Sequence, residues 1–281
     1  MKDRDILDLV VRLKAAKEPF ALATVVRTVS VTAAKAGAKA VIRSDGTICE
    51  GWIGGGCARS AVLKAAREAL DDGRPRLISI APGDVLEAGG VTAGETRDGV
   101  HFARNMCPSK GTMDVFVEAV MPAPECIVCG TSPVALALAD LAPRFGFDVT
   151  ACAPAEELSA FAAGTRRVEG YAIEVIGSRA RHIVVATQGR GDEAALRAAL
   201  SVPADYVAFV GSRAKTAALR DRVNAAGVPP EDLARLHAPA GLDLGAITPE
   251  EIALSILAEM VRQRRRGQRA TGGATGTDTY T

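Results

Sequence analysis

Hydrophobic positions in the first 120 residues follow helical spacing in two segments and strand spacing in most of the others. Apolar side chains recur every three or four positions from Ile6 to Leu13, which predicts a helix over residues 3–17. A second helix is predicted from Ala58 to Leu70 and ends at Gly73. Runs of β-branched and apolar residues predict strands at 20–31, at 39–53 with a hairpin turn at 44–47, at 76–81 and at 112–120, with loops and short strands before residue 106.

After residue 125 short apolar runs alternate with amphipathic segments. This alternation is typical of βαβ units on a parallel sheet. The last helix has a strong start signal, because Thr248 supplies an N-cap hydroxyl, Pro249 suits the first helical position and Glu251 completes a capping box. The predicted strands are 126–129, 148–152, 183–186 and 206–210, and the predicted helices before the last one are 133–145, 192–200 and 215–226.

These patterns predict an α/β protein with two domains. Residues 1–120 form an N-terminal α+β domain with a glycine-rich GGGC loop, and residues 121–124 form a linker. Residues 125–265 form a Rossmann-like domain with a parallel sheet. Residues 266–281 are too polar and glycine-rich to bury a core, so we expect a disordered tail.

Composition excludes several classes of protein. The chain is 48% hydrophobic and 24% charged, as soluble globular proteins are. Aromatic residues make up 4% and the net charge is +1, so we expect no nucleic-acid partner. No apolar run approaches the ~18–20 residues of a membrane span, and the N-terminus lacks the apolar core of a signal peptide. With six cysteines expected to be free thiols, we predict a cytoplasmic protein.

Three successive glycines, Gly54, Gly55 and Gly56, precede Cys57 at the start of a predicted helix. Glycine backbone approaches a ligand closely, and the unpaired amides of a helix start favour an anion such as phosphate. The same position favours the thiolate of Cys57, although the helix dipole alone supplies only ~0.3–1 kcal/mol. The alternative, with equal weight, is a tight turn and a buried cysteine.

Other cysteines differ in their setting. Cys107 lies in a glycine-flanked loop with Lys110 nearby, which suits a reactive thiol, but a loop cysteine without function is the more frequent case. Cys126 and Cys129 lie on one predicted strand, where a spacing of three places them on opposite faces. The three histidines are scattered, so we expect no zinc site.

The turn after residue 129 occupies the place where a dinucleotide fold holds its phosphate-binding glycines. Gly130 is present, but Ser132 stands where the second glycine belongs. The segment 150–154 also lacks the carboxylate that binds a ribose in such folds. We therefore predict the fold and doubt NAD(P).

Two further segments of the second domain carry polar side chains. A small basic anion-binding arrangement follows a predicted strand and opens a helix; the alternative is an ordinary helix cap with solvated cations. This arrangement consists of Gly211, Ser212, Arg213 and Lys215. His237 begins a turn-rich loop upstream of the last helix, where a structural role is the more frequent one.

In combination these segments resemble the XdhC/CoxI family, the accessory factors of xanthine dehydrogenase and carbon monoxide dehydrogenase. The resemblance extends over nearly the whole chain before the tail. One departure is Ala58-Arg59, where the family often has a Leu-Glu pair after GGGC. The matching segments are 37–39, 54–57, Cys107 with 113–118, 206–213, and 237–243 with 248–253.

The resemblance implies a chaperone without turnover of its own. Its cargo is the molybdenum cofactor, as molybdopterin or its cytosine dinucleotide form, and its partners are a molybdenum hydroxylase apoenzyme and a cysteine desulfurase. We also expect a homo-oligomer. The implied cofactor-binding residues are Gly54, Gly55, Gly56, Cys57, Cys107, Gly130, Ser132, Gly211, Ser212, Arg213, Lys215 and His237.

Within this set, Cys57 and Cys107 are the expected contacts of the molybdenum centre, and Cys57 is the expected carrier of transferred sulfur. Soft thiolates suit such a centre. Two alternatives remain: an NAD(P)-dependent oxidoreductase, suggested by the βαβ half, and a sulfur-transfer enzyme that uses Cys57.

Overall fold

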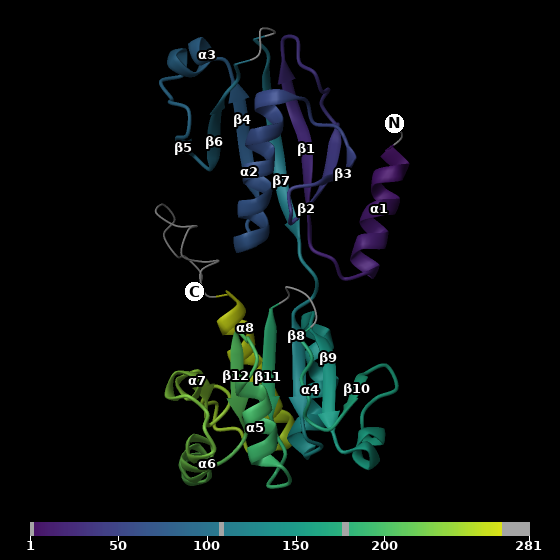
Figure 1. Ribbon diagram of the computed structural model, residues 1–281, viewed down its shortest axis with the longest axis vertical. Coiled ribbons are helices and arrows are strands. Elements are labelled where there is room, and N and C mark those ends of the chain that lie inside the picture. The colour runs from purple at the N-terminus through teal and green to yellow at the C-terminus, as the bar shows by residue number, and fades with distance from the viewer. Residues whose placement is uncertain (1–2, 107–109, 176–179, 266–281) are drawn as a thin grey trace, which may run out of the picture. The chain divides into compact units, whose positions relative to one another are not determined.

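The computed structural model describes the backbone of residues 3–106, 110–175 and 180–265, without the side chains of residues 3–5 and Cys57. The chain divides into two compact units, Met1–Pro122 and Ala123–Thr281. Each unit has its own sheet and its own buried core (Figure 1).

Unit 1 is built on a seven-stranded sheet in the order β3-β2-β1-β7-β4-β6-β5. Only the β4 and β6 neighbours run parallel. The predicted hairpin is confirmed, since β2 pairs with β3 across the turn. The strands are β1 Phe20–Val29, β2 Lys39–Arg43, β3 Ile48–Gly51, β4 Arg76–Ala81, β5 Thr96–Arg97, β6 Val100–Arg104 and β7 Thr112–Val120, and the helices are α1 Asp3–Ala15, α2 Gly56–Asp72 and α3 Gly83–Ala88.

Helix α2 covers one face of this sheet (Figure 1). Its apolar stripe, which includes Val62 and Ala66, is buried against β1, β4 and β7, so helical periodicity determines which face turns inward. Gly73 ends α2 in the left-handed conformation with φ +70°. On the other face, Ile6 and Leu13 of α1 pack with residues of β1 and β2. Helix α3 lies in the stretch for which the sequence predicts loops and short strands, and that prediction is wrong there.

Unit 2 has a six-stranded sheet in the order β10-β9-β8-β11-β12-β13, with every neighbouring pair parallel. In chain order this is 3-2-1-4-5-6, the Rossmann order, and the predicted Rossmann-like fold is confirmed. The strands are β8 Glu125–Cys129, β9 Asp148–Ala153, β10 Arg166–Glu169, β11 Arg181–Val185, β12 Tyr206–Phe209 and β13 Leu236–His237. The helices are α4 Pro133–Leu141, η1 Ala142–Phe145, η2 Ala155–Ala160, α5 Asp192–Leu200, α6 Arg213–Ala225, α7 Pro230–Ala234 and α8 Pro249–Arg265.

Helices cover both faces of this sheet. Helices α4 and α8 pack on the face that holds Cys126, and α5 and α6 pack on the face that holds Cys129, so the predicted opposite orientation of these cysteines is confirmed. The predicted single helix over 133–145 is wrong in its last turn, which is a 3-10 helix containing Pro143. Proline lacks the amide that continues an α-helix.

The predicted capping box of α8 is confirmed. The Glu251 amide donates to Thr248 Oγ1 at 3.3 Å, and the Thr248 amide donates to Glu251 Oε2 at 2.9 Å. The predicted tail, residues 266–281, lies outside the described residues. Among the helices of the described residues, none is both long and apolar enough to cross a bilayer.

Candidate functional site

The glycine turn between β3 and α2 needs glycine at two positions. Gly54 has φ +104° and Gly56 has φ +53°, both in the left-handed region that side chains disfavour. Gly55 is the N-cap of α2, and it offers no side chain to accept from the amides of the first turn. The turn therefore presents a helix start whose amides lack a side-chain acceptor from the N-cap residue.

Cys57 is the second residue of α2, in its first turn, as predicted. Its side chain is not among the described ones, and Cys107 lies outside the described residues. The chemical roles of both thiols therefore stay predictions.

The described residues on either side of Cys107 are joined to each other and packed against the chain. Asn105 Nδ2 donates to the carbonyl oxygen of Gly111 at 2.7 Å, which joins the two ends. A Cβ at Gly111 would lie 2.2 Å from the carbonyl oxygen of Val31, so only glycine fits there. Next along the chain, Met113 of β7 lies 3.7 Å from the place of a Cβ on Gly54. The residues that flank Cys107 and the glycine turn before Cys57 therefore lie at the same end of the sheet in unit 1 (Figure 1).

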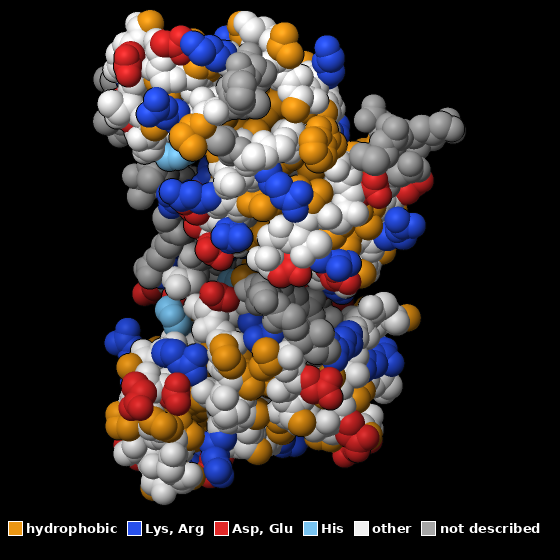
Figure 2. All heavy atoms as spheres, turned by 45° about the horizontal axis from the view of Figure 1, so that its top comes forward, with side chains coloured by type: hydrophobic (Ala, Val, Ile, Leu, Met, Phe, Trp, Pro, Cys, Tyr) orange, Lys and Arg blue, Asp and Glu red, His pale blue; other side chains and the backbone are white. Residues whose placement is uncertain are grey.

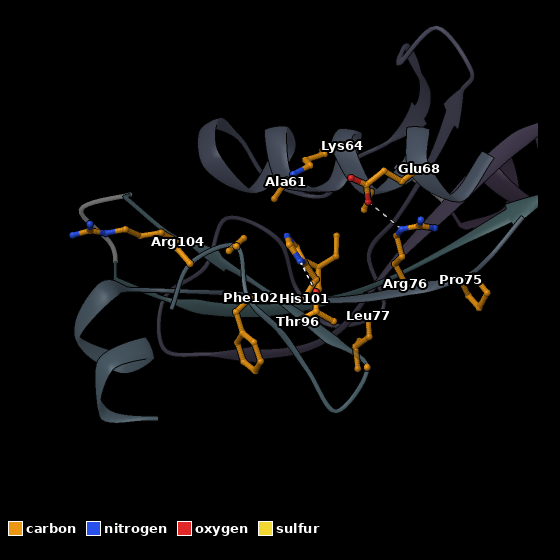
Figure 3. Close-up of a pocket in the computed structure, with 16 residues that line it drawn as sticks. Ala61, Lys64, Glu68, Pro75, Arg76, Leu77, Thr96, His101, Phe102 and Arg104 are labelled. Carbon is orange, nitrogen blue, oxygen red and sulfur yellow. Dashed lines mark hydrogen bonds and ion pairs between the residues drawn. The ribbon is translucent and has the colours of Figure 1, made fainter. Parts of the chain in front are cut away.

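A pocket of about 660 Å³ lies beside α2 in unit 1, over the edge strands of the sheet (Figure 3). Sequence analysis missed it, because its walls come from segments far apart in the chain. Two of its lining residues on α2, Ala61 and Ala65, are small, and this leaves space between the helix and the sheet. The sequence does contain one signal for the helix wall of this pocket: Ala61, Lys64 and Glu68 are spaced three and four residues apart and so lie on one face of a helix.

In unit 2, Gly130 and Ser132 occupy the turn after β8, and their contacts account for both. Gly130 has φ +99°, and a Cβ there would lie 2.6 Å from the Cα of Thr187 in the loop after β11. Ser132 is the N-cap of α4, and its Oγ accepts from the Ala135 amide at 3.2 Å. Packing and capping therefore require these residue types without any nucleotide.

A carboxylate does reach this turn, from a residue that sequence analysis did not consider. Thr131 Oγ1 donates to Glu157 Oε2, and Arg190 lies 3.2 Å from Glu157 Oε1. Glu157 belongs to η2, just after β9, close in sequence to the strand end where a ribose-binding acid was sought and not found. Its oxygens are already engaged by protein groups.

The segment from Gly211 to Lys215 forms the start of α6. Ser212 Oγ accepts from the Lys215 amide at 3.2 Å, and a Cβ at Gly211 would lie 2.5 Å from the Phe209 ring. Lys215 Nζ lies 2.7 Å from Asp192 Oδ2, so its charge is balanced within the protein. Arg213 is exposed. Of the two predicted cations in this segment, Lys215 therefore already forms an ion pair within the protein.

Asp192 is a buried carboxylate with several donors. It accepts from the Gly189 amide at 2.9 Å and from Thr187 Oγ1, besides Lys215. Burial raises the pKa of Asp192, but its hydrogen bonds, led by that with Lys215, outweigh burial and hold the pKa below the ordinary value. This cluster ties the loop after β11 to α6.

His237 lies at the end of β13 and contacts a second buried carboxylate. Its Nδ1 is 3.4 Å from Glu259 Oε1, and its ring centroid is 4.7 Å from that of Tyr206. Glu259 on α8 also accepts from Tyr206 OH at 2.7 Å and from the Gly241 amide at 3.0 Å. These contacts join the 237–243 loop to α8, and the predicted role of His237 in cofactor binding stays a prediction.

The predicted site residues therefore fall into two groups. The 54–57 turn belongs to unit 1, whereas the other described ones lie along the carboxyl ends of β8, β12 and β13 in unit 2. In the described part of the chain, no three His, Cys, Asp or Glu side chains gather as metal ligands would. On the face shown in Figure 2, the described acidic and basic side chains are interspersed.

Comparison with known proteins gives matches in both units. The model of the XdhC and CoxI family matches residues 13–81, and that of the XdhC Rossmann domain matches residues 126–260. The chain belongs to the XdhC and CoxI family. The first match includes the glycine turn and most of α2, and the second includes the whole Rossmann sheet.

Two curated proteins and one solved structure align with the chain at identities between 18% and 30%. The chain is 30% identical over 262 residues to the uncharacterized protein YqeB of Escherichia coli, covering 91% of this chain and 45% of YqeB. It is 27% identical over 163 residues to a probable xanthine dehydrogenase subunit of Bacillus subtilis, covering 55% of this chain and 47% of that protein. The chain thus spans about half the length of these curated relatives. A crystal structure of a xanthine dehydrogenase from Bacillus halodurans aligns over 96% of this chain and 98% of that chain, with 18% identity and a TM-score of 0.45.

Proposed function

We propose that this protein binds the molybdenum cofactor as a transient cargo and supports its maturation and insertion into a molybdenum hydroxylase of the xanthine or carbon monoxide dehydrogenase type. The cargo is molybdopterin or its cytosine dinucleotide form. Membership of the XdhC and CoxI family supports this proposal, with matches in both units. The partners are the hydroxylase apoenzyme and a cysteine desulfurase, and the chaperone acts in the cytoplasm as a homo-oligomer.

The observation that carries the proposal is the glycine turn at the start of α2. Left-handed Gly54 and Gly56 bracket an N-cap without a side chain, and Cys57 follows in the first helical turn. Backbone amides at a helix start suit the phosphate of the cargo, and a thiolate suits its soft metal. Asn105 and Gly111, on either side of Cys107, are hydrogen-bonded next to the start of β7, and Met113 of β7 lies beside this turn, which supports a shared site.

Cys57 has two proposed roles. Its thiolate contacts the molybdenum centre, or it carries sulfur from the desulfurase. In the second role the thiolate attacks the outer sulfur of the donor persulfide, a new S–S bond forms on Cys57, and the donor cysteine leaves as a thiolate. This exchange needs no added oxidant or reductant, because one S–S bond replaces another.

The test is co-expression with a molybdenum cofactor pathway, followed by quantification of bound molybdenum and pterin by mass spectrometry. Wild type, Cys57→Ala and Cys49→Ala are compared, because Cys49 is a half-buried free cysteine on β3 and serves as a matched control. We expect stoichiometric pterin on wild type and Cys49→Ala, and its loss from Cys57→Ala. Equal loading of all three would refute a role of Cys57, and an empty wild type would refute the chaperone function.

A nucleotide-dependent oxidoreductase is the alternative, favoured by the strand order of unit 2. The capping role of Ser132 and the engaged oxygens of Glu157 weigh against it. Calorimetry with NAD(H) and NADP(H) distinguishes the two, since tight stoichiometric binding favours the oxidoreductase. The other alternative, a sulfur-transfer enzyme, would yield a persulfide on Cys57 after incubation with a desulfurase.

A further inference from the structure

The pocket beside α2 is distinct from the glycine turn. Its floor comes from the face of β4 and β6 that turns towards the helix, including Ile78, His101 and Ala103. Its wall on α2 comes from Ala61, Lys64, Ala65 and Glu68. At about 660 Å³ it lies within the range of ~300–1,000 Å³ that is usual for small-molecule sites. The volume therefore suits a ligand of the size of a substituted ring system.

Positive charge in this pocket is not balanced by the acid that lines it. Glu68 Oε2 is 3.1 Å from Arg76 Nε, and Arg76 also pairs with Asp72 at 2.9 Å. The Lys64 ammonium forms no ion pair or hydrogen bond with the described residues. Arg76 is shared by Glu68 and Asp72, so these three side chains carry one net negative charge, whereas Lys64 and Arg104 of the lining add two positive charges. The surroundings of the pocket are therefore net positive, and Lys64 favours a ligand with a negative group.

An imidazole faces the same space. Figure 3 shows Lys64 on α2 and His101 rising from β6 towards the helix. His101 Nδ1 lies 3.1 Å from Thr96 Oγ1, which orients the ring and leaves Nε2 for a ligand. The small apolar side chains of Ala61, Ala65 and Ala103 lie between these polar groups and the buried core. Such a surface accommodates a flat ring.

We propose that this pocket binds a heteroaromatic ring that carries an anionic group, with Lys64 contacting the anion and His101 Nε2 hydrogen-bonding to the ligand. Under the proposed function, on which the ligand's identity rests, this is the pterin of the cargo. Ala61 follows Cys57 by four residues on α2, a rise of ~6 Å along the helix axis. The pocket thus begins one turn from the proposed metal-contacting position.

The test titrates the full chain into pterin-6-carboxylate, a fluorescent anionic pterin, and follows its anisotropy. We expect Lys64→Ala to weaken binding at least tenfold and His101→Ala to weaken it several-fold. Ala61→Leu narrows the pocket at its wall on α2 without a change of charge, and we expect it to weaken binding. The control is Lys14→Ala, because Lys14 is an exposed lysine on α1, near the opposite edge of the sheet. Thermal unfolding of each variant checks that the fold is intact.

The same variants are co-expressed with the cofactor pathway, which separates the two proposals. If wild type carries pterin and Lys64→Ala and Ala61→Leu carry as much, the pocket is refuted and the chaperone function stands. If wild type carries none, yet the pterin probe binds and depends on Lys64 and Ala61, the pocket stands and the chaperone function is refuted. If folded wild type does not bind the probe and carries no pterin, both are refuted.

Discussion

Gly130→Ala separates a packing role of this glycine from a nucleotide-binding one. Gly130 has φ +99°, and an added Cβ would lie 2.6 Å from the Cα of Thr187 and 2.7 Å from the carbonyl oxygen of Ala186. Both atoms are backbone, so they yield only if the loop after β11 moves. We expect this substitution to destabilise unit 2 markedly.

The magnitude follows from two contributions. A left-handed conformation costs an alanine ~1–2 kcal/mol relative to glycine. Overpacking against rigid neighbours adds ~1–3 kcal/mol. Gly146→Ala is the matched control, because Gly146 has φ +77° and nothing within 4 Å of its Cβ position, so it carries only the first cost. Gly130→Ala should therefore be the less stable of the two by ~1–3 kcal/mol.

Urea unfolding followed by circular dichroism measures this difference. Trp52, the single tryptophan, lies in unit 1, so its fluorescence reports on that unit and serves as an internal control. We expect the Trp52 transition to stay in place while the transition of unit 2 moves to lower urea. Equal destabilisation by Gly130→Ala and Gly146→Ala would show that the contact with the β11 loop yields freely, and the packing argument would then fail.

Two further predictions concern pH and helix capping. Burial lowers the pKa of His182 to about 4 from an ordinary 6.5. Between these pH values the imidazole is protonated in the unfolded chain and neutral in the folded chain, so stability falls as pH falls. The free energy of unfolding of unit 2 should fall by about 3 kcal/mol as pH drops from 6.5 to 4. In urea unfolding at a series of pH values, a His182→Leu variant should show a flatter dependence of stability on pH. An unchanged dependence would exclude His182 as the cause. Thr248→Ala removes the N-cap hydroxyl of α8 and should cost ~1 kcal/mol in the same assay, whereas Thr248→Ser, which keeps the hydroxyl, should cost little; equal losses would show that the hydroxyl is not responsible.

Local sequence signals determined much of the fold. The strands at 76–81 and 112–120 lie as predicted, because runs of β-branched and apolar residues bury one or both faces of a strand whatever its partners are. The capping box of α8 also forms as predicted, since its hydrogen bonds join residues three apart. The place of Cys57 in the first turn of α2 follows from three glycines before a helical stripe. In each case the interacting groups are neighbours in the chain.

Tertiary structure alone decided which polar groups meet. Lys215 pairs with Asp192, and His237 contacts Glu259. Each pair joins two elements that are separate in the chain, so the sequence around Lys215 or His237 does not indicate its partner. The short strands β10 and β13 form because longer neighbours offer them backbone partners. The pocket beside α2 exists because small residues of the helix lie over the strand that holds His101. Local periodicity determines which side of an element is buried, whereas the packing of distant elements determines which side chains it meets there.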